Sequence, residues 1–347
     1  MINLKNIAIS YDDNTVVKDL TLRLKQGEIG CLLGASGSGK STLLQAIAGF
    51  KALDRGEITL RDRVVASDSI NVAPNKRNVA MVFQDFALFP HLSVADNIAF
   101  GLSGKSATQK QQIVDELLSL VGLSGFASRA IHQLSGGQQQ RVAVARAIAP
   151  EPDLILFDEP FSSLDTELRL ELATQVKRIL NERQMTAILV THDHQEAFLF
   201  ADKIGVLQQG SIQQWDTGFN VYHRPETPYV AEFVGKGRFI EGEITSTTTV
   251  NTVFGELTTL HPQQKALGEK VRVLLRPDDI VHDDDSTLKA KVISRQFRGA
   301  DILFRLEVPI EGCNENMVVH CISLSHHDHK PGESIGIKFD LQHVICF

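Results

Sequence analysis

The sequence Gly34-Ala35-Ser36-Gly37-Ser38-Gly39-Lys40-Ser41-Thr42 decides the fold of this chain. It fits G-x-x-x-x-G-K-[ST], the pattern of a phosphate-binding loop. Residues 28–33 before it are typical of a short buried strand, and the apolar residues after it recur at helical spacing until Gly49. The loop therefore lies between a strand and the start of a helix, where its phosphate-binding mechanism requires it.

This loop has the chemistry of a nucleoside triphosphate site. Glycines let the backbone curl until several N–H groups face one anion, and the helix start adds about half a positive charge. We expect Lys40 to reach the β- and γ-phosphates and the Ser41 hydroxyl to bind Mg²⁺. A chance match in a Gly/Ser loop is the alternative, which the flanking strand and helix disfavour. The other expected nucleotide contacts in the loop are Gly34, Ser36, Gly37, Ser38, Gly39 and Thr42.

Length and composition bound the class of protein. The 347 residues suffice for two domains, and 43% hydrophobic with 22% charged residues is a globular composition. The net charge of −7 provides no broad basic face, so we expect no nucleic-acid partner. With no secretory leader and no apolar run near the ~18 residues of a membrane helix, we expect a soluble, unexported chain. Reduced cytosolic thiols fit the spacing of Cys31, Cys313, Cys321 and Cys346.

Polar or aromatic side chains stand at the ends of several predicted strands. Tyr11 ends the first of the alternating, half-buried, antiparallel strands between residues 2 and 24. Gln84 follows strand 79–83, and His192 follows strand 187–191. Open α/β sheets bind ligands at the carboxyl edge of their strands, so both are candidates for phosphate contacts. Alone, each residue has an ordinary alternative: a sheet-edge aromatic, a polar cap or a hydrogen-bonded histidine.

Two carboxylates, Asp158 and Glu159, end the buried strand 154–159, and charges in that position require a reason. In nucleotide hydrolases the first acid supports Mg²⁺, and the second orients or deprotonates the attacking water. These six residues alone leave open the alternative of two acids at the start of a surface loop.

A second anion-binding pattern lies in the region 85–149, which has a helical periodicity. Ser135-Gly136-Gly137 opens a helix and so combines free N–H groups, a hydroxyl and the helix dipole. Taken alone, the stretch is also compatible with an ordinary capped turn. Its presence beside a phosphate-binding loop favours the anion-binding interpretation.

Six motifs in one order connect these observations. They are the phosphate-binding loop, Gln84, Leu134-Ser135-Gly136-Gly137-Gln138, Asp158-Glu159, Ser163-Leu164-Asp165 and His192. They resemble the motifs of the ATP-binding-cassette (ABC) ATPases, for which the Leu-Ser-Gly-Gly-Gln pentad is close to diagnostic. The resemblance covers residues 1 to about 235. It implies an α/β fold: a P-loop NTPase core of a mixed sheet with helices, and an inserted helical subdomain at about 85–150.

The resemblance implies a role for each polar residue near the phosphates, with ATP and Mg²⁺ as cofactors. Ser41, Gln84 and Asp158 hold Mg²⁺. Glu159 is the general base, Gln84 also contacts the attacking water, and His192 contacts the γ-phosphate. The expected catalytic residues are therefore Glu159, His192 and Gln84.

The resemblance also implies nucleotide contacts beyond the phosphates. Tyr11 stacks on the adenine, and Asp165 belongs to the nucleotide site. The family further implies a head-to-tail homodimer, in which the ATP held by one loop is covered by the other subunit. The covering residues are Ser135, Gly136 and Gly137, and Gln138 of the same motif is counted among the nucleotide-binding residues.

Residues 85–94 resemble the importer version of the family, in which this segment receives a helix of a transmembrane permease subunit. Subdomain core is an equally good interpretation of its aromatic residues from the sequence alone. As an importer subunit, the chain is expected to be peripheral, at the cytoplasmic face of the bacterial inner membrane. A periplasmic solute-binding protein is then an indirect partner.

Short strands separated by Gly, Pro and Asp clusters follow Lys236 and predict a small all-β barrel or sandwich. We therefore expect a nucleotide-binding domain at 1–235 and a regulatory β domain at 236–347. Leu275-Arg276-Pro277-Asp278 resembles the signature of the oligonucleotide-binding-like barrel found on importers of sugars, polyamines, sulfate and ferric iron.

As a whole, the resemblance implies the ATP-hydrolysing subunit of a bacterial importer, which couples ATP hydrolysis to solute uptake. The chain length and the junction Phe233-Val234-Gly235-Lys236-Gly237 most resemble ferric-iron importers, so Fe³⁺ is the expected solute. Polyamine, sulfate, molybdate and sugar import are the alternatives. More distant ones are a soluble cassette ATPase, whose coiled-coil insertions or second cassette the sequence lacks, and a metal-sensing interaction protein.

A histidine cluster, His326-His327-Asp328-His329, raises the question of a metal site, with His320 and Cys321 nearby. Consecutive histidines point in different directions along a strand and lack the pair spacing of zinc sites. The cluster also precedes Lys330-Pro331-Gly332. We therefore predict a solvated loop here rather than a metal site.

Overall fold

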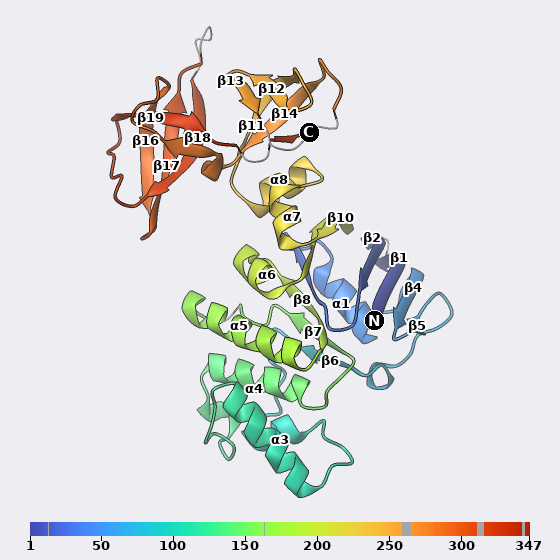
Figure 1. The fold of residues 1–347 in the computed structure, drawn as a ribbon. Helices are drawn as coiled ribbons and strands as arrows, with labels where there is room; N and C mark the ends of the chain where they lie inside the picture. Colours follow the sequence, from blue (N-terminus) through green and yellow to red (C-terminus); the bar gives the residue numbers. More distant parts are fainter. Residues whose placement is uncertain (13, 163, 259–264, 311–315, 342–343) are drawn as a thin grey trace. The chain divides into compact units, whose positions relative to one another are not determined.

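The computed structural model describes residues 1–12, 14–162, 164–258, 265–310, 316–341 and 344–347 (Figure 1). The chain divides into two units, Met1–Gly218 and Phe219–Phe347. The boundary between the two units lies before Lys236, where the composition changes. The domain limits 1–235 and 236–347 therefore stay a prediction. Ser163 and Cys313 lie outside the described residues.

A six-stranded sheet forms the centre of the first unit. Its order is β10-β9-β3-β8-β7-β6, and the neighbours from β9 to β6 are parallel. β3, β7 and β8 are buried along nearly their whole length, as is typical of parallel strands covered on both faces. The buried strands predicted there are confirmed. The bounds are β3 Ile29–Gly34, β6 Val79–Val82, β7 Leu154–Asp158, β8 Thr186–Thr191, β9 Lys203–Gln208 and β10 Ser211–Asp216.

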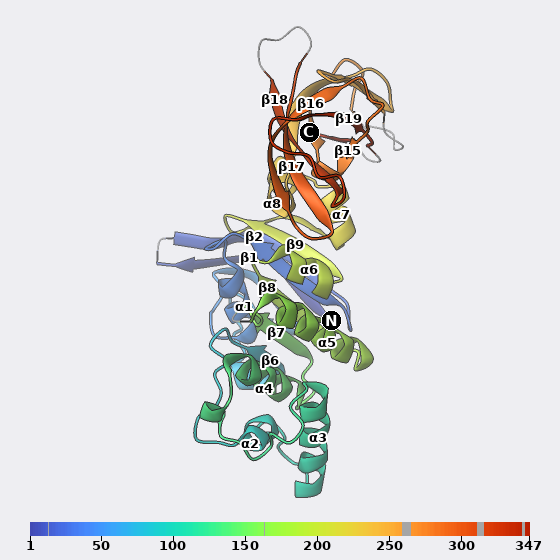
Figure 2. The same cartoon turned by 90° about the vertical axis from the view of Figure 1, so that its left-hand side faces the viewer.

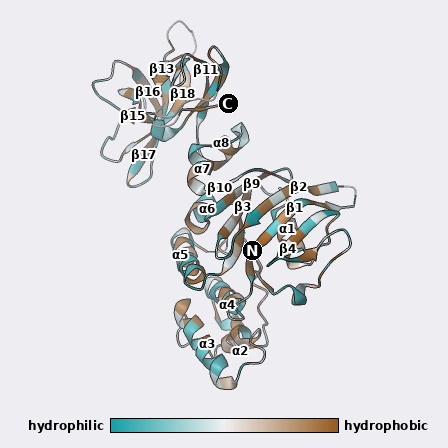
Figure 3. Ribbon diagram, turned by 45° about the vertical axis from the view of Figure 1, so that its right-hand side comes forward, coloured by the Kyte–Doolittle hydropathy of each residue, from teal (hydrophilic) through white to brown (hydrophobic). Residues whose placement is uncertain are grey.

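An antiparallel sheet of order β2-β1-β4-β5 shares one hydrophobic core with the central sheet and with helix α1 (Lys40–Ala48). The pairing of β1 with β2 confirms the antiparallel strands that the alternation predicts. Figure 3 shows hydrophobic and hydrophilic residues mixed along both strands. The core thus holds the helix that begins at the phosphate-binding loop. The bounds are β1 Ile2–Tyr11, β2 Asn14–Leu24, β4 Arg55–Leu60 and β5 Arg63–Ala66.

A buried arginine fixes the C-terminal end of α1. Arg77 donates hydrogen bonds to the carbonyl oxygens of Ala46 at 2.7 Å and Ile47 at 2.8 Å, which lie in the last turn of the helix, where the usual i+4 donors run out. It also donates to the Val72 carbonyl and to Asn71 Oδ1, both at 2.7 Å. Burial lowers the pKa of Arg77, and charge-assisted hydrogen bonds compensate for its desolvation. This anchor also restrains the phosphate-binding loop at the other end of the helix.

Helices cover the central sheet and extend beyond it (Figure 2). The region 85–149 contains three α-helices separated by turns and a short 3-10 helix, and Figure 2 shows α2, α3 and α4 together at one end of the unit. The inserted helical subdomain is therefore present, with more breaks than the periodicity predicts. The bounds are η1 Pro74–Lys76, α2 Val94–Ala99, α3 Ala107–Leu120, η2 Ile131–Gln133, α4 Gly136–Ile148, α5 Thr166–Glu182 and α6 His194–Phe200.

The second unit is mostly β structure. Two five-stranded sheets have the orders β13-β12-β11-β14-β20 and β15-β19-β16-β17-β18. Their cores share Phe254, Met317 and Phe339, so the sheets form one barrel-like domain, as predicted. The bounds are α7 Gly218–His223, α8 Pro228–Val234, β11 Arg238–Ile244, β12 Thr249–Thr252, β13 Gly255–Thr258, β14 Lys270–Leu275, η3 Pro277–Asp279, β15 Ile280–His282, β16 Lys289–Phe297, β17 Asp301–Val308, β18 Met317–Leu324, β19 Ser334–Phe339 and β20 Ile345–Cys346.

Arg276, from the motif after β14, connects the helical and β parts of this unit. Its buried guanidinium donates to the carbonyl oxygens of Ala231 at 3.0 Å and Tyr222 at 3.2 Å, and lies 4.3 Å from the Tyr222 ring centroid. Its backbone N–H donates to Asp279 Oδ2 at 2.7 Å, and burial raises the pKa of Asp279 to about 7. This part of the signature therefore has a structural role in the second unit.

Candidate nucleotide-binding site

One edge of the central sheet collects the residues predicted to bind phosphate. Because β3, β8, β7 and β6 are parallel neighbours, their carboxyl ends lie along the same edge. The phosphate-binding loop leaves β3, His192 follows β8, Asp158 ends β7, and the exposed Gln84 lies just beyond β6. The topology thus brings together residues that are far apart in the sequence.

A cavity at the start of α1 is lined by Val16, Glu159 and residues 36–42. Gly39 precedes the helix with a φ of 101°, in the left-handed region that favours glycine. A Cβ at this position would lie 2.9 Å from the Val16 carbonyl oxygen. Because the first amides of a helix have no intrahelical acceptor, those of α1 are available to an anion in this cavity.

Lys40 occupies a buried position at the base of the loop. Its Nζ donates to the carbonyl oxygens of Gly34 at 2.8 Å and Ala35 at 2.9 Å. Burial lowers the pKa of Lys40, while the nearby carboxylates of Glu159 and Asp158 act in the opposite direction. The ammonium group is therefore held in the loop that would receive the phosphates.

The Ser41 hydroxyl and the Asp158 carboxylate form a pair of hard oxygen donors. Ser41 Oγ donates to Asp158 Oδ1 at 2.9 Å, although the two residues come from different elements. Burial raises the pKa of Asp158, Glu159 adds to this effect, and the Ser41 hydrogen bond and Lys40 oppose it. Mg²⁺ prefers such oxygens, so this donor set fits the ion and would hold it beside the phosphates.

Glu159 is placed by its backbone as well as by its side chain. Its φ is 47°, and its N–H donates to the Val190 carbonyl at 2.9 Å, which ties the end of β7 to β8. Its Oε1 lies 3.2 Å from Nδ1 of the largely exposed His192. Glu159 thus lines the cavity next to a group able to orient it. An unusual backbone conformation of this kind is frequent at functional sites.

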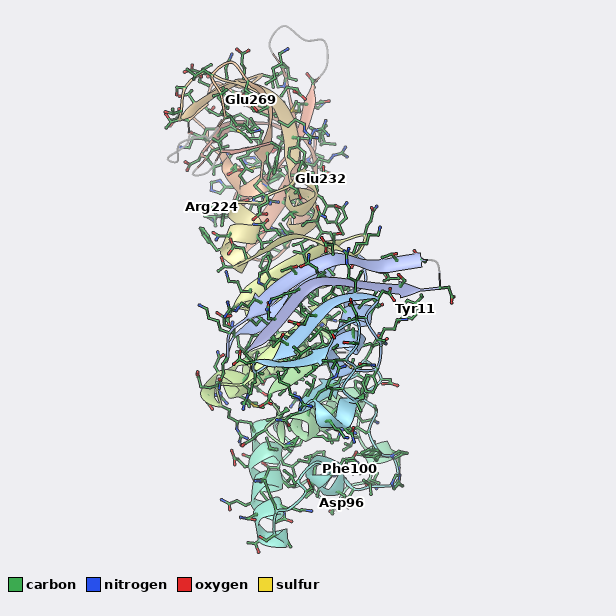
Figure 4. All side chains as sticks on the ribbon, turned by 90° about the vertical axis from the view of Figure 1, so that its right-hand side faces the viewer. Tyr11, Asp96, Phe100, Arg224, Glu232 and Glu269 are labelled. Carbon is green, nitrogen blue, oxygen red and sulfur yellow. The ribbon has the colours of Figure 1, made fainter. Side chains whose placement is uncertain are left out.

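Tyr11 lies at the end of β1, next to the turn into β2 (Figure 4). Its side chain is 44% exposed, and its hydroxyl donates to Gln45 Oε1 of α1 at 3.3 Å. Lys51 Nζ lies 4.0 Å from the ring centroid. The ring is therefore linked to the phosphate-binding helix, and a cation covers one of its faces.

The Ser-Gly-Gly stretch begins α4, as predicted. Ser135 is the N-cap: its hydroxyl accepts from the Gln138 N–H at 3.4 Å, and Gln138 Oε1 accepts from the Ser135 N–H at 3.0 Å. Ser135 and Gly136 are exposed, and neither lines the cavity at α1. Asp165 caps a different helix, α5, by accepting from the Leu168 N–H at 3.0 Å. Within the described part of one chain, α4, which we call the signature helix because it begins at the Leu-Ser-Gly-Gly-Gln motif, does not line the phosphate-binding cavity.

Comparisons with known proteins agree with this geometry. Residues 17–162 match the ABC transporter family model, and residues 273–347 match the TOBE domain model. The chain is 39% identical to the spermidine/putrescine import ATP-binding protein PotA of Acetivibrio thermocellus, over 98% of this chain and 94% of the relative. It is also 39% identical to the protein of the same name from Clostridium acetobutylicum, over 97% of this chain and 93% of the relative.

The chain belongs to the ABC transporter ATP-binding protein family. It is an ATPase with the P-loop cassette fold and a C-terminal TOBE domain. The sequence-based expectation of ferric iron receives no support, since both relatives are named for spermidine/putrescine import.

Solved cassettes are similar to somewhat less than two thirds of this chain. A dimeric post-hydrolysis structure of the cassette MJ0796 with ADP and Pi is 30% identical, covers 62% of this chain and 98% of its own, and has a TM-score of 0.56. The cassette cbiO1 of Clostridium perfringens, part of the transporter complex cbiONQ, is 27% identical, with 65% and 91% coverage and a TM-score of 0.59. Among the described residues of this chain, none of the helices is long and apolar enough to cross a membrane.

Sequence reasoning missed two residues of this ABC site. Val16 lines the cavity from β2, and Lys51 lies over the Tyr11 ring. Val16 reaches the loop through the closing of the β1–β2 hairpin over α1, and an apolar residue in an alternating strand gives no local sign of this. Lys51 follows the C-cap of α1, where a surface lysine is unremarkable.

We expect Gly39→Ala to lower the affinity for ATP about tenfold or more, because a side chain there must adopt a positive φ next to the Val16 carbonyl. Titration with a fluorescent ATP analogue measures this. The control is Gly104→Ala, which has a φ of 79° but open space around its added Cβ, outside the loop. Equal ATP affinities of Gly39→Ala and the parent protein would contradict the loop geometry.

Proposed function

We propose that this chain is the ATP-hydrolysing subunit of a polyamine importer. The observation that carries this proposal is the near full-length similarity to two relatives named for spermidine/putrescine import. Polyamine import is one of the alternatives that the sequence offers beside ferric iron. In such an importer the permease subunits and the solute-binding protein contact the solute, and the ATPase does not. The relatives are therefore a better guide to the solute than the nucleotide site is.

In this proposal the cavity at α1 holds the triphosphate. Lys40 leaves the loop carbonyls to contact the β- and γ-phosphates, and Ser41 with Asp158 holds Mg²⁺, aided by Gln84 from the neighbouring strand end. Mg²⁺ would supply charge neutralisation for the transferred phosphoryl group. Glu159 accepts a proton from the attacking water, and the 3.2 Å contact with His192 orients its carboxylate.

The nucleotide site is completed by a second copy of the chain. Ser135 and Gly136 are exposed at the start of α4, outside the cavity of their own chain. The start of their helix offers amides and a dipole to an anion, but it does not line the phosphate-binding cavity of its own chain. In a head-to-tail homodimer it covers the γ-phosphate bound by the partner, and Tyr11 stacks on the adenine. The similar cassette MJ0796 is described as dimeric.

The segment 85–94 has the features of a docking surface for a permease subunit. Arg146 of α4 donates to the carbonyl oxygens of Ala87 at 2.7 Å and Phe86 at 3.0 Å. Asn97 of α2 accepts from the Phe89 N–H at 2.9 Å. The Arg146 bonds tie the segment to α4, whose N-cap is Ser135, and the Asn97 bond ties it to α2. Phe100, labelled in Figure 4, is 63% exposed beside Phe89, with ring centroids 4.3 Å apart.

Docking and nucleotide sensing are thus connected by one rigid helix in this proposal. A permease helix that moves segment 85–94 also moves α4, and with it the Ser135 end that contacts the partner's ATP. The expected assembly has two ATPase subunits and permease subunits at the cytoplasmic face of the inner membrane. A periplasmic polyamine-binding protein joins it indirectly.

Glu159→Gln is expected to keep ATP affinity and lose turnover by about 10²–10⁴-fold, because it removes the base and preserves the shape. Lys40→Ala is expected to lose both, because the ammonium also stabilises bound ATP. Nucleotide titration and steady-state phosphate release measure the two quantities. Glu182→Gln, an exposed change on α5, is the control and should leave both unchanged. Near-parental hydrolysis by Glu159→Gln would show that another group is the base.

The polyamine assignment is tested in membranes. We expect the chain, co-expressed with the permease subunits that co-purify with it, to drive ATP-dependent uptake of spermidine into proteoliposomes in the presence of the matching binding protein. The Glu159→Gln assembly is the control and should not accumulate spermidine. Uptake of Fe³⁺, sulfate or a sugar in place of spermidine would contradict the polyamine assignment and would leave the ATPase mechanism intact.

A further inference from the structure

Three histidines from distant positions meet in the second unit. The ligand-capable atoms of His282, His327 and His329 all lie within 4.8 Å of one another. His282 ends β15, and the other two lie in the turn after β18. β15 and β18 are the two edge strands of their sheet, and they contact each other. The closing of the barrel therefore creates the cluster.

Two nitrogens of this cluster are buried without hydrogen-bond partners among the described residues: Nε2 of His282 and Nε2 of His329. The His282 side chain is only 7% exposed. Asp284 Oδ1 lies 3.1 Å from His282 Nε2, but the two are not aligned for a hydrogen bond. Buried polar atoms are nearly always satisfied in proteins, so these two nitrogens are available to a ligand in the cluster.

The groups around the cluster support cation binding rather than oppose it. The Glu333 carboxylate lies 3.6 Å from Nδ1 of His329, just beyond hydrogen-bond distance and on the side from which a carboxylate can orient a metal-binding imidazole. Asp284 is close enough to His282 to offer an oxygen as a further ligand. Asp328, the acid within the histidine sequence, is not counted as a ligand because it forms an ion pair with Arg295.

We propose that His282, His327 and His329 bind a late first-row divalent cation, with Zn²⁺ as the representative ion. Imidazole nitrogens suit zinc, nickel and copper, whereas Mg²⁺ and Ca²⁺ prefer oxygen ligands. Zinc sites with three protein ligands keep a fourth position for water or a carboxylate. Bonds of about 2.0–2.1 Å in a tetrahedral site place ligand nitrogens about 3.3 Å apart, so the imidazole nitrogens, which lie within 4.8 Å of one another, must move closer together to bind the ion.

The proposed site differs from the expected solvated loop in two respects. The third ligand is His282, which the local spacing of residues 326–329 could not include. His326 is exposed and lies outside the group of three; its ring is tilted by 39° against that of His327, with ring centroids 4.4 Å apart. Cys321 is engaged elsewhere, since its thiol donates to the Ile280 carbonyl at 3.0 Å.

The test uses the full chain without an affinity tag and without nucleotide. Equilibrium dialysis with Zn²⁺ should give one tight equivalent, and Co²⁺ should give the intense visible absorption of a tetrahedral nitrogen site. His282→Gln and His329→Gln are each expected to weaken Zn²⁺ binding at least 10-fold and to remove the Co²⁺ bands. The matched control His326→Gln lies in the same turn and should keep both.

Circular dichroism of each variant checks its folding. If the buried His282→Gln does not fold, His329→Gln decides the matter, because its side chain is partly exposed on a turn. The proposal is overturned if the parent chain binds no stoichiometric Zn²⁺. It is equally overturned if a folded His329→Gln binds Zn²⁺ as tightly as His326→Gln. Neither result bears on the polyamine assignment, which depends on uptake measurements.

Discussion

Opposite charges held at one sheet edge are the constraint on which the nucleotide site depends. The start of α1 and the buried Lys40 concentrate positive charge. Asp158 and Glu159 bring two carboxylates to the end of β7, which is separated from β3 in the sheet by β8 alone. The observed directions of the pKa shifts follow from this arrangement: burial disfavours each charge, and the neighbouring charges partly restore Lys40. ATP with Mg²⁺ adds an anion and a cation to the same place, and so matches both sets of charges at once.

The rest of the first unit supports this edge. Arg77 restrains the far end of α1, and the hydrogen bond from the Glu159 N–H to the Val190 carbonyl holds Glu159 against the neighbouring strand. The helical subdomain has a different task. Its α4 begins at the exposed Ser135 and carries, at its other end, the arginine that holds segment 85–94. In the proposed function, this one helix connects the permease-docking segment to the partner's nucleotide.

Much of this architecture could be predicted from the sequence, because its signals are local. The loop at residues 34–42 and the buried strands β7 and β8 have continuous sequence patterns that few other structures allow. Contacts that depend on closing a sheet could not be predicted. Val16 meets the loop only through a hairpin, and His282 meets His327 only because β15 and β18 join the barrel. The solute was the weakest prediction for a physical reason: its contacts belong to other proteins.

The most direct test of the account is whether two chains share one ATP site. A Ser135→Arg chain and a Lys40→Ala chain are each expected to be inactive alone, because every site of either homodimer contains the defect. Verified heterodimers of the two retain one site with an intact loop and an intact signature helix. We predict that these heterodimers regain a substantial part of the ATPase activity per intact site. Heterodimers as inactive as the two parents would contradict a nucleotide site shared between subunits.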